Sequence, residues 1–525
     1  MIWSDGSVGH KPILKRKKAK RRGVVKPYLF HVVLYAVKKR VIVIGSGVAG
    51  LSAACRLQAQ GHAVTVFEAN TYPGGKLTQF VLNGYRFDAG PSLFTMPDFL
   101  DAVFLAAGKN PRNYYTYKKI DTTCHYFFED GSRLHAFADA HQFAAEVENK
   151  WNVPARVVRH YLERSRHIYN SAGQIFLQNS LHKLSTWLTR AVAKALVKIP
   201  MLGIFTTLHR YNQGKLKDPR LVQLFDRYAT YNGSDPYQAP GILASIPHLE
   251  FNIGTYLPEG GMHTITKALY QLACDLGVAF RFQSPVAEIL TTHNQATGVR
   301  AGANTFEADA VVSNMDVYHT YRKLLPHHPA PEKTLAQERS SSALIFYWGM
   351  RRAFRELHLH NILFSENYRA EFDGLFKTYT ITHDPTVYIN ITSKYVAADA
   401  PAGGENWFVM INVPANKGQN WDAWVPECRA NIIRKINRLL NTNIEPLIVC
   451  EEILDPRAIE SKTSSFQGSL YGTSSNNKFA AFLRHPNFSS NIKNLYFCGG
   501  SVHPGGGIPL ALNSGKIVSE LIETK

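Results

Sequence analysis

The feature that most constrains the fold is a glycine loop enclosed between an apolar run and a helical stretch. Residues 41–44 are continuously apolar, as expected for a parallel strand that is buried on both faces. They lead directly into Gly45-Ser46-Gly47-Val48-Ala49-Gly50 and then into residues 51–60, which have a helical pattern. Residues 63–67 predict a second strand, and Glu68 follows it. Strand, glycines, helix, second strand and acid in this order predict an α/β fold with a Rossmann-type domain.

The spacing within this loop has a physical reason. Gly45 permits a tight turn, Gly47 lets the backbone approach a pyrophosphate, and Gly50 lets helix and strand pack closely. The first helical residues present backbone N–H groups and the positive end of the helix dipole to the phosphates. The predicted nucleotide contacts of the loop are Gly45, Gly47, Val48, Ala49 and Gly50. A glycine turn that binds no nucleotide is the alternative, because the motif also has false matches.

Glu68 stands 18 residues beyond Gly50, where its carboxylate can accept hydrogen bonds from ribose hydroxyls. An acid at this position disfavours a 2′-phosphate on the ribose. The residues alone therefore leave FAD or NAD as the cofactor.

A second glycine-rich unit lies near residue 500. Residues 495–498 predict a short strand, 503–507 a loop with little bulk, and 508–522 a helix. A glycine loop that enters a helix presents backbone N–H groups, which suits a flavin or its ribityl chain; a surface loop before an ordinary helix is the alternative. The predicted contacts are Gly500, Ser501, Gly507, Ile508 and Pro509. No second GxGxxG follows a strand downstream, which favours substrate oxidation with an electron acceptor such as quinone or oxygen.

Several blocks of the sequence resemble a known family. Glu68 through Pro73-Gly74-Gly75-Lys76 is similar to the segment around the ribose-binding acid in flavoproteins of the amine-oxidase superfamily. Tyr85-Arg86-Phe87-Asp88-Ala89-Gly90-Pro91-Ser92 looks like the following block of the bacterial carotenoid desaturases of the phytoene-desaturase type. The resemblance continues in residues 256–262, 310–314 and 496–509, and it covers residues 40 to 525.

The resemblance implies FAD as the cofactor and adds contacts to it. These are Gly75, Lys76, Gly90, Pro91, Ser92 and Val286, the last in a strand over 285–289 whose backbone meets the adenine end. It also implies that the C-terminal unit packs back onto the N-terminal domain and completes the FAD site. One departure is Ser501, which stands where many amine-oxidase relatives have an acid.

The resemblance implies a carotenoid desaturase that forms a C–C double bond by hydride transfer from the polyene to flavin N5. Residues 92–97 and 499–503 look more like the 3,4-desaturases of hydroxylated carotenoids than like phytoene desaturases. A phytoene desaturase, a flavin amine oxidase and a flavin-free lipid carrier similar to GDP-dissociation inhibitors are the alternatives. The sequence assigns no catalytic residue. The scattered histidines His248, His263, His319 and His485 have no metal-ligand spacing and are expected at surface or loop positions.

The net charge of +19 is concentrated in two segments. Residues 1–40 contain 12 Lys/Arg against one acid, and residues 151–220 contain 12 Lys/Arg against two acids. The first segment predicts a disordered extension, or upstream sequence joined to a true start near Val37. A nucleic-acid arm is the sharper alternative, and no nucleic-acid partner is expected.

The second segment predicts an amphipathic helix over 181–199. At 3.6 residues per turn its apolar face contains Leu181, Leu184, Leu188, Val192, Ala195 and Ile199, and its cations Lys183, Arg190, Lys194 and Lys198 lie opposite or on the flank. Together with the apolar patch at 201–205 it predicts contact with a membrane surface through residues 181–205. Packing of the apolar face on the protein core is the alternative. The widely spaced cysteines suit reduced thiols, so we expect a cytoplasmic protein that is peripheral on the inner membrane face.

These observations predict a division into an FAD-binding domain, a mixed-sheet substrate domain and a helical membrane-associating insert. The FAD-binding domain comprises residues 40–120, 281–320 and 481–525, and the substrate domain 121–150, 221–280 and 321–480. The basic insert comprises 151–220, and residues 1–39 precede all of them.

Overall fold

The computed structural model describes residues 38–525 except 174, 175, 178, 190–201, 478, 480–482, 524 and 525. The predicted disordered extension therefore lies outside the described residues, apart from its last two positions. The predicted division into domains stays a prediction, and the description below follows the sheets.

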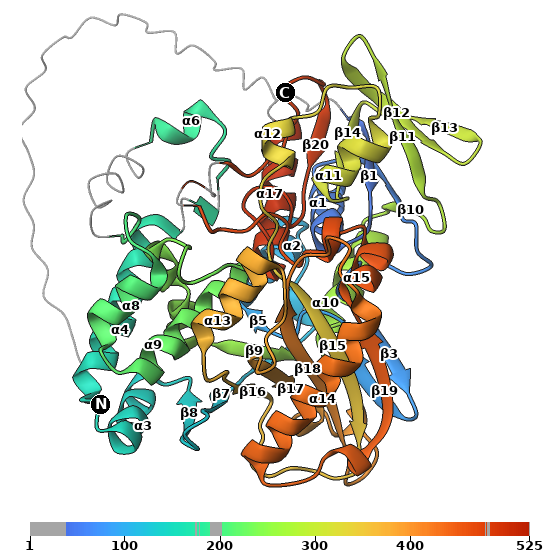
Figure 1. The fold of residues 1–525 in the computed structure, drawn as a ribbon. Coiled ribbons are helices and arrows are strands. Elements are labelled where there is room, and N and C mark those ends of the chain that lie inside the picture. The colour runs from blue at the N-terminus through green and yellow to red at the C-terminus, as the bar shows by residue number, and fades with distance from the viewer. Residues whose placement is uncertain are drawn as a thin grey trace, which may run out of the picture. The chain divides into compact units, whose positions relative to one another are not determined.

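Five short strands from distant parts of the chain form one parallel sheet (Figure 1). Their order is β10 (Ala279–Arg281), β2 (Ala63–Phe67), β1 (Arg40–Ile44), β14 (Ala310–Ser313) and β20 (Leu495–Phe497). Val43 of the central strand β1 stands opposite Val66 of β2 and Val312 of β14. All three side chains are buried, and residues of the opposite face, such as Ile42 and Val311, lie in a second apolar cluster. Burial on both faces explains the continuous apolar run in β1.

Four helices pack around the side chains of this sheet in one apolar cluster: α1 (Val48–Ala59), α2 (Pro97–Ala106), α10 (Thr264–Asp275) and α17 (Ile508–Glu523). Helix α1 begins at Val48, three residues earlier than the apolar pattern predicts, because Gly47 takes an extended conformation and acts as its N-cap. Helix α17 lies against α1 at Gly515, where an added Cβ would stand 2.8 Å from the Ala49 carbonyl oxygen. The C-terminal helix is thus packed directly on the first one.

A larger mixed sheet of seven strands forms the second layered unit. Its order is β19 (Ile448–Leu454), β15 (Ser342–Met350), β18 (Glu405–Val413), β17 (Val387–Asn390), β16 (His360–Leu363), β7 (Thr122–Phe127) and β8 (Arg133–Phe137). Only the β16–β7 pair is parallel. Every residue of β15 is buried, and helix α14 (Trp421–Leu440) contributes to the same apolar cluster. The aromatic strand predicted over 342–349 is therefore a core strand of this sheet.

The remaining elements are short sheets and helices around these two units. The small sheets are β3 (Gln79–Leu82) with β4 (Tyr85–Asp88); β5 (Phe94–Thr95), β9 (Thr255–Pro258) and β6 (Tyr117–Lys119); and β11 (Val286–Thr292), β12 (Gln295–Ala301) and β13 (Asn304–Glu307). The further helices are α3 (Ala140–Trp151), α4 (Ala155–Ile168), α6 (Leu184–Trp187), α8 (Leu208–Leu216), α9 (Pro219–Asp226), α11 (Val317–His319), α12 (Glu332–Leu335), α13 (Tyr368–Asp373) and α15 (Pro456–Thr463).

The described part of the predicted amphipathic helix differs from the prediction. The helix does not begin at Leu181, because the Trp187 indole N–H donates to the Leu181 carbonyl at 2.9 Å and closes a turn there. Helix α6 is a single turn, and residues 190–201 lie outside the described residues. Leu181 is 8% exposed and Leu188 is 80% exposed, so these two residues do not share one face. No helix in the described ranges is both long and apolar enough to cross a membrane.

Because β15 is buried, we expect that shortening one of its side chains strongly lowers the free energy of unfolding. Phe346 is fully buried in the cluster between β15 and α14, so Phe346→Ala should lower the free energy of unfolding by about 3–5 kcal/mol. Urea unfolding followed by tryptophan fluorescence measures this change. Leu105→Ala, at an exposed position on α2, should leave the urea midpoint almost unchanged; an equal shift in both variants would contradict the assignment of β15 to the core.

Candidate functional site

The predicted site residues gather at the carboxyl ends of neighbouring parallel strands. Each strand is followed directly by a part of the site. Glu68 follows β2, and the loop beginning with Gly45 follows β1. Asn314 follows β14, and the loop beginning with Cys498 follows β20. These four strands are adjacent in the sheet. In open α/β sheets, ligands bind outside the carboxyl ends of the strands, so the sheet itself places the two glycine-rich loops at one site.

The loop after β1 leaves the start of α1 open to a ligand. Gly45 has a φ of +92°, and a Cβ on Gly50 would stand 2.1 Å from the Gly45 carbonyl oxygen, so both positions require glycine. No side chain caps the helix at Gly47. The N–H groups of Val48 and Ala49 therefore lack intrahelical partners, while their side chains are buried in the core. This arrangement fits a pyrophosphate bound by backbone N–H groups.

Glu68 is buried and its carboxylate is held at the edge of this loop. One oxygen accepts from the Ser46 backbone N–H at 2.8 Å and from the Ser46 hydroxyl at 2.6 Å. The other oxygen accepts from the Asn70 N–H at 2.9 Å. The Ser284 N–H donates to the Glu68 carbonyl at 2.9 Å, which brings the segment leading to Val286 next to the acid. Glu68 and Val286 therefore lie at the same end of the site.

Asn314 connects the two loops, and the sequence analysis did not single it out. Its side-chain amide donates to the Gly45 carbonyl at 3.4 Å, and its carbonyl oxygen lies 3.7 Å from the Cys498 sulfur, the donor. Its backbone N–H donates to the Ile44 carbonyl at 2.8 Å. The signal that could have identified it is its place directly after a fully buried four-residue strand, β14.

The segment with Gly74, Gly75 and Lys76 lies beside the first loop. The Gly74 N–H donates to the Ser46 carbonyl at 2.9 Å. The Lys76 ammonium donates to the carbonyls of Ser469 and Leu470 at 3.2 and 3.0 Å. Loss of hydration lowers the pKa of Lys76 to about 8, although Asp316 favours its charged form. A Cβ on Gly90 would stand 1.9 Å from the Lys76 carbonyl oxygen, so Gly90 is held against the same segment.

The C-terminal loop meets these segments through Arg484. This buried side chain donates to the carbonyls of Tyr471 and Gly500 at 3.2 and 3.4 Å, and burial lowers its pKa to about 10. Ser501 is buried, and its hydroxyl oxygen accepts from the Val317 N–H at 3.0 Å, so this serine holds the start of α11. Gly507 is exposed and Ile508 begins α17.

The charges around the loops are mainly positive. The charge of Arg339 lowers the pKa of both Lys76 and Arg484, and Asp316 accepts from Arg339 at 3.4 Å. Two guanidinium nitrogens of Arg339 are buried without a hydrogen-bond partner among the described residues. The arrangement suits a cofactor that gains negative charge during the reaction.

Three predicted contacts are placed differently from the rest. Pro91 is exposed, and Pro509 lies in the first turn of α17, where it has no backbone N–H to offer. Ser92 points toward the larger sheet, because its hydroxyl lies 2.9 Å from that of Tyr388. These three residues are close to the glycine loops in sequence. The two prolines have no backbone N–H to donate to a cofactor, and the Ser92 side chain is directed toward Tyr388.

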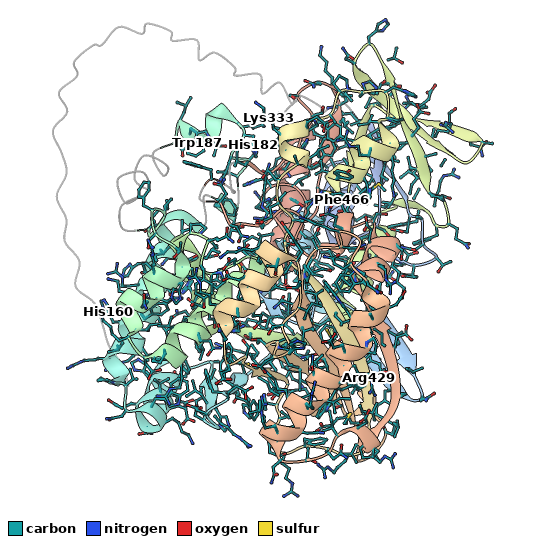
Figure 2. All side chains as sticks on the ribbon, viewed as in Figure 1. His160, His182, Trp187, Lys333, Arg429 and Phe466 are labelled. Atoms are coloured by element: carbon teal, nitrogen blue, oxygen red, sulfur yellow. The ribbon has the colours of Figure 1, made fainter. Side chains whose placement is uncertain are left out.

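The described part of the insert is attached to the C-terminal loop. The His503 ring nitrogen Nε2 lies 2.8 Å from the Asn179 carbonyl oxygen, and Asn513 donates to the Leu177 carbonyl. The rings of His182 and His503 are 5.8 Å apart, and Figure 2 shows His182 and Trp187 on the segment around α6. Burial lowers the pKa of His503 to about 4, so its imidazole is neutral at pH 7.

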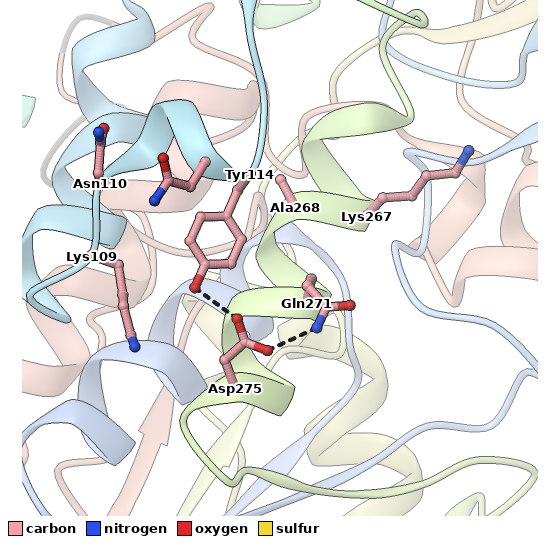
Figure 3. Close-up of a pocket in the computed structure, with 8 residues that line it drawn as sticks. Lys109, Asn110, Tyr114, Lys267, Ala268, Gln271 and Asp275 are labelled. Atoms are coloured by element: carbon pink, nitrogen blue, oxygen red, sulfur yellow. Dashed lines mark hydrogen bonds between the residues drawn. The ribbon is translucent and has the colours of Figure 1, made fainter.

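Two other features do not belong to this site. A surface hollow of about 520 Å³ lies where Tyr114 and Gln271 donate to Asp275 (Figure 3), and none of the predicted site residues lines it. Of the histidines expected at surface or loop positions, His248, His319 and His485 are buried and thus do not lie at the surface. The sequence pattern missed the burial of His319 and His485 because their ring nitrogens have partners far along the chain, Glu460 and Tyr321 respectively. Among the described residues, no group of three or more candidate ligands could hold a metal ion.

Comparison with known proteins identifies the class to which this fold and site belong. Residues 48–522 match the family described as flavin containing amine oxidoreductase, and the chain belongs to this family. The chain is 53% identical to the 1-hydroxycarotenoid 3,4-desaturase of Flavobacterium sp. (strain P99-3), over 92% of this chain and 99% of the relative. It is 33% identical to the 4,4′-diapolycopene oxygenase of Methylomonas sp, over 92% of this chain and 98% of the relative.

Solved structures share the fold at low sequence identity. Cyclohexylamine oxidase from Brevibacterium oxydans matches with a TM-score of 0.59 at 14% identity, over 93% of this chain and 99% of its own. Putrescine oxidase bound to putrescine matches with a TM-score of 0.61 at 14% identity, over 93% of this chain and 100% of its own. These structures confirm the α/β class with mixed sheets. The family match and the curated relatives confirm an oxidoreductase activity and FAD as the cofactor.

The position of Glu68 predicts a loss of FAD affinity on neutralisation. Glu68→Gln removes a charge that accepts hydrogen bonds at the edge of the glycine loop. The dissociation constant of FAD should rise roughly 10- to 150-fold, which corresponds to about 1.5–3 kcal/mol. Titration of the apoprotein with FAD by flavin fluorescence measures it. Glu332→Gln, which removes an exposed partner of Arg322, is the matched control, and equal affinities in both variants would contradict the predicted role.

Proposed function

We propose that this chain is an FAD-dependent desaturase of a hydroxylated carotenoid, in which it introduces the 3,4 double bond. The observation that carries this proposal is the 53% identity, over almost the full length of both chains, to a 1-hydroxycarotenoid 3,4-desaturase. Sequence blocks on either side of the site, at residues 92–97 and 499–503, favour the same class.

In this proposal the five-stranded sheet is the Rossmann-type part of an FAD-binding domain. Backbone N–H groups after Gly47 hold the pyrophosphate, and the Glu68 carboxylate accepts from the ribose. The loops with Gly75, Gly90 and Gly500 hold the flavin end. The arguments for this assignment are the uncapped start of α1 and the junction of both glycine loops at Asn314.

The chemistry requires a hydride acceptor and an environment without water. The substrate must lose a hydride and a proton. FAD held by the glycine loops at Gly47 and Gly500 would supply the hydride acceptor, and an acceptor such as quinone or oxygen would take up the two electrons. Tyr347 donates to the Ala89 carbonyl at 2.8 Å, and it packs with Phe87 and Phe408 in one apolar cluster. These buried rings give the segment that leads to Gly90 an apolar neighbour. The cations Lys76, Arg339 and Arg484 stabilise negative charge that develops at the site.

We further propose that the enzyme is peripheral on the cytoplasmic face of the inner membrane and binds it through residues 181–205. Leu188 and Phe205 are 80% and 76% exposed. They flank the part of the insert that contains Arg190, Lys194 and Lys198. Exposed apolar side chains beside cations are the composition that binds an anionic lipid surface.

The proposed reaction can be tested by pigment analysis. Expression of the chain in a bacterial host that accumulates a 1-hydroxylated carotenoid should give a product with two hydrogens fewer and a longer absorption wavelength, since the polyene is extended. Chromatography with mass spectrometry identifies the product. Gly47→Val, whose new Cβ would stand 2.7 Å from the Asn314 amide nitrogen, should abolish the conversion. A product that has gained an oxygen atom relative to the substrate would instead favour an oxygenase, and an unchanged pigment would contradict the proposal.

Membrane binding can be tested with two matched double variants. Leu188→Asp with Phe205→Asp removes apolar area worth about 25 cal/mol per Å² of buried surface, and it should reduce flotation with anionic liposomes. Val81→Asp with Leu105→Asp changes two exposed apolar residues elsewhere and should leave flotation unchanged. The assay is run at high salt, which screens the charge attraction common to both variants. Equal flotation of the two variants would exclude the insert as the binding surface.

A further inference from the structure

Three hydrogen-bonding side chains form a continuous chain between the proposed flavin site and the larger sheet. The Ser92 hydroxyl lies 2.9 Å from the Tyr388 hydroxyl, which in turn lies 2.7 Å from Nδ1 of His360. The Asn390 side-chain amide lies 3.2 Å from the same ring nitrogen. His360 is buried, and it faces Asn390 across the β16–β17 pair.

The neighbours of His360 define the direction of every hydrogen bond in this chain. The Asn390 amide nitrogen also donates to the Leu359 carbonyl at 3.0 Å, so the nitrogen near His360 is a donor and Nδ1 accepts. Burial lowers the pKa of His360 to about 3, so the imidazole is neutral. The single lone pair of Nδ1 therefore accepts mainly from the Tyr388 O–H at 2.7 Å and shares the longer contact with Asn390 at 3.2 Å. Since the Tyr388 O–H is used in this way, the Tyr388 oxygen accepts from the Ser92 O–H. The Ser92 oxygen keeps lone pairs that can accept a further hydrogen bond.

The other end of the chain has an unused donor. Because Nδ1 accepts, the proton of the neutral ring is on Nε2. This N–H is buried and has no hydrogen-bond partner among the described residues. A buried polar group without a partner is costly. The cost suggests that this polar chain serves more than stability.

Aromatic rings pack against the Tyr388 part of this chain. Tyr388 packs against Phe408 with ring centroids 6.2 Å apart, and Phe408 packs against Tyr347 at 5.5 Å. Ser92 follows Gly90 by two residues, and Gly90 is held against the Lys76 backbone. The Ser92 end is thus the one nearest to the glycine loops, and it places a single hydroxyl beside aromatic rings.

A hydrocarbon polyene cannot form a hydrogen bond, whereas a hydroxyl group at C1 can. Three bonds separate the oxygen of a 1-hydroxyl group from C3. A protein group that binds this oxygen must therefore lie next to the carbon pair that reacts, close to the flavin. Among the hydrogen-bonded residues described above, Ser92 meets this requirement.

We infer that Ser92 accepts a hydrogen bond from the 1-hydroxyl group of the substrate, and that Tyr388 and His360 are positioning residues that orient the serine. This inference rests on the proposed function and adds to it the residue that selects a hydroxylated carotenoid. Selection arises because a substrate without the hydroxyl would not donate to the serine oxygen, so one hydrogen bond made with the hydroxylated pigment would be lost.

The test compares a 1-hydroxylated carotenoid with its analogue lacking the hydroxyl, using the flavin-loaded full chain in detergent. Ser92→Ala should lower kcat/KM for the hydroxylated pigment about 10- to 100-fold and leave the analogue unaffected. Ser92→Thr, which retains a hydroxyl, should keep most of the preference. Tyr388→Phe should reduce the preference in the same direction, because the serine loses its acceptor.

Two further measurements separate recognition from damage to the fold. Dissociation constants of both pigments, from quenching of flavin fluorescence, should lose their difference in Ser92→Ala. Tyr321→Phe removes the hydroxyl of another buried tyrosine that is hydrogen-bonded to a histidine, His485. This variant should leave unchanged both the ratio of kcat/KM and the ratio of dissociation constants for the two pigments. Flavin content is measured in every variant.

Each outcome decides the inference. The role of Ser92 would be overturned, while the proposed function stands, if Ser92→Ala lowered kcat/KM equally for the two pigments or left the ratio of their kcat/KM values unchanged. A wild-type enzyme that converts neither pigment would overturn the proposed function and this inference with it.

Discussion

The arrangement of the site depends on strand β14, which pairs in parallel with β1 on one side and with β20 on the other. This pairing brings the carboxyl ends of three strands from distant parts of the chain together, and with them both glycine-rich loops. Asn314 then fixes the distance between the loops through Gly45 and Cys498. Strand β14 is the neighbour of β20 in this sheet, so it sets the register of the C-terminal loop against the first loop, and the packing of α17 on α1 supports the same placement.

The local parts of this arrangement could be predicted from sequence. Strand β2 has the predicted bounds, and β1 and α17 differ from their predictions by one residue at one end, because burial on both faces and glycine spacing leave direct patterns in the chain. The start of α1 was predicted three residues late, since the pattern does not reveal that Gly47 is extended. Elements whose signal is local were therefore predicted well.

The long-range contacts could not be predicted. Nothing in the sequence indicates that Asn314 bridges two loops, or that His360 and Tyr388 share one face of a strand pair. The turn at Leu181 interrupts a regular apolar spacing, because two side chains, Thr186 and Trp187, bond backbone carbonyls there. The buried histidines follow the same rule: their environment is decided by partners that are distant along the chain.

An enzyme with a hydrocarbon substrate gains little discrimination from apolar packing, since one added methylene changes binding by only about 1–3 kcal/mol. A buried polar group is more selective, because a substrate that cannot pair with it leaves that group unsatisfied. The chain from Ser92 through Tyr388 to His360 supplies such a group next to Gly90 and is otherwise surrounded by aromatic rings. The Ser92 end of this chain lies next to Gly90 in sequence, and the His360 end is fixed by the pairing of β16 with β17. The serine is therefore oriented by residues of the larger sheet.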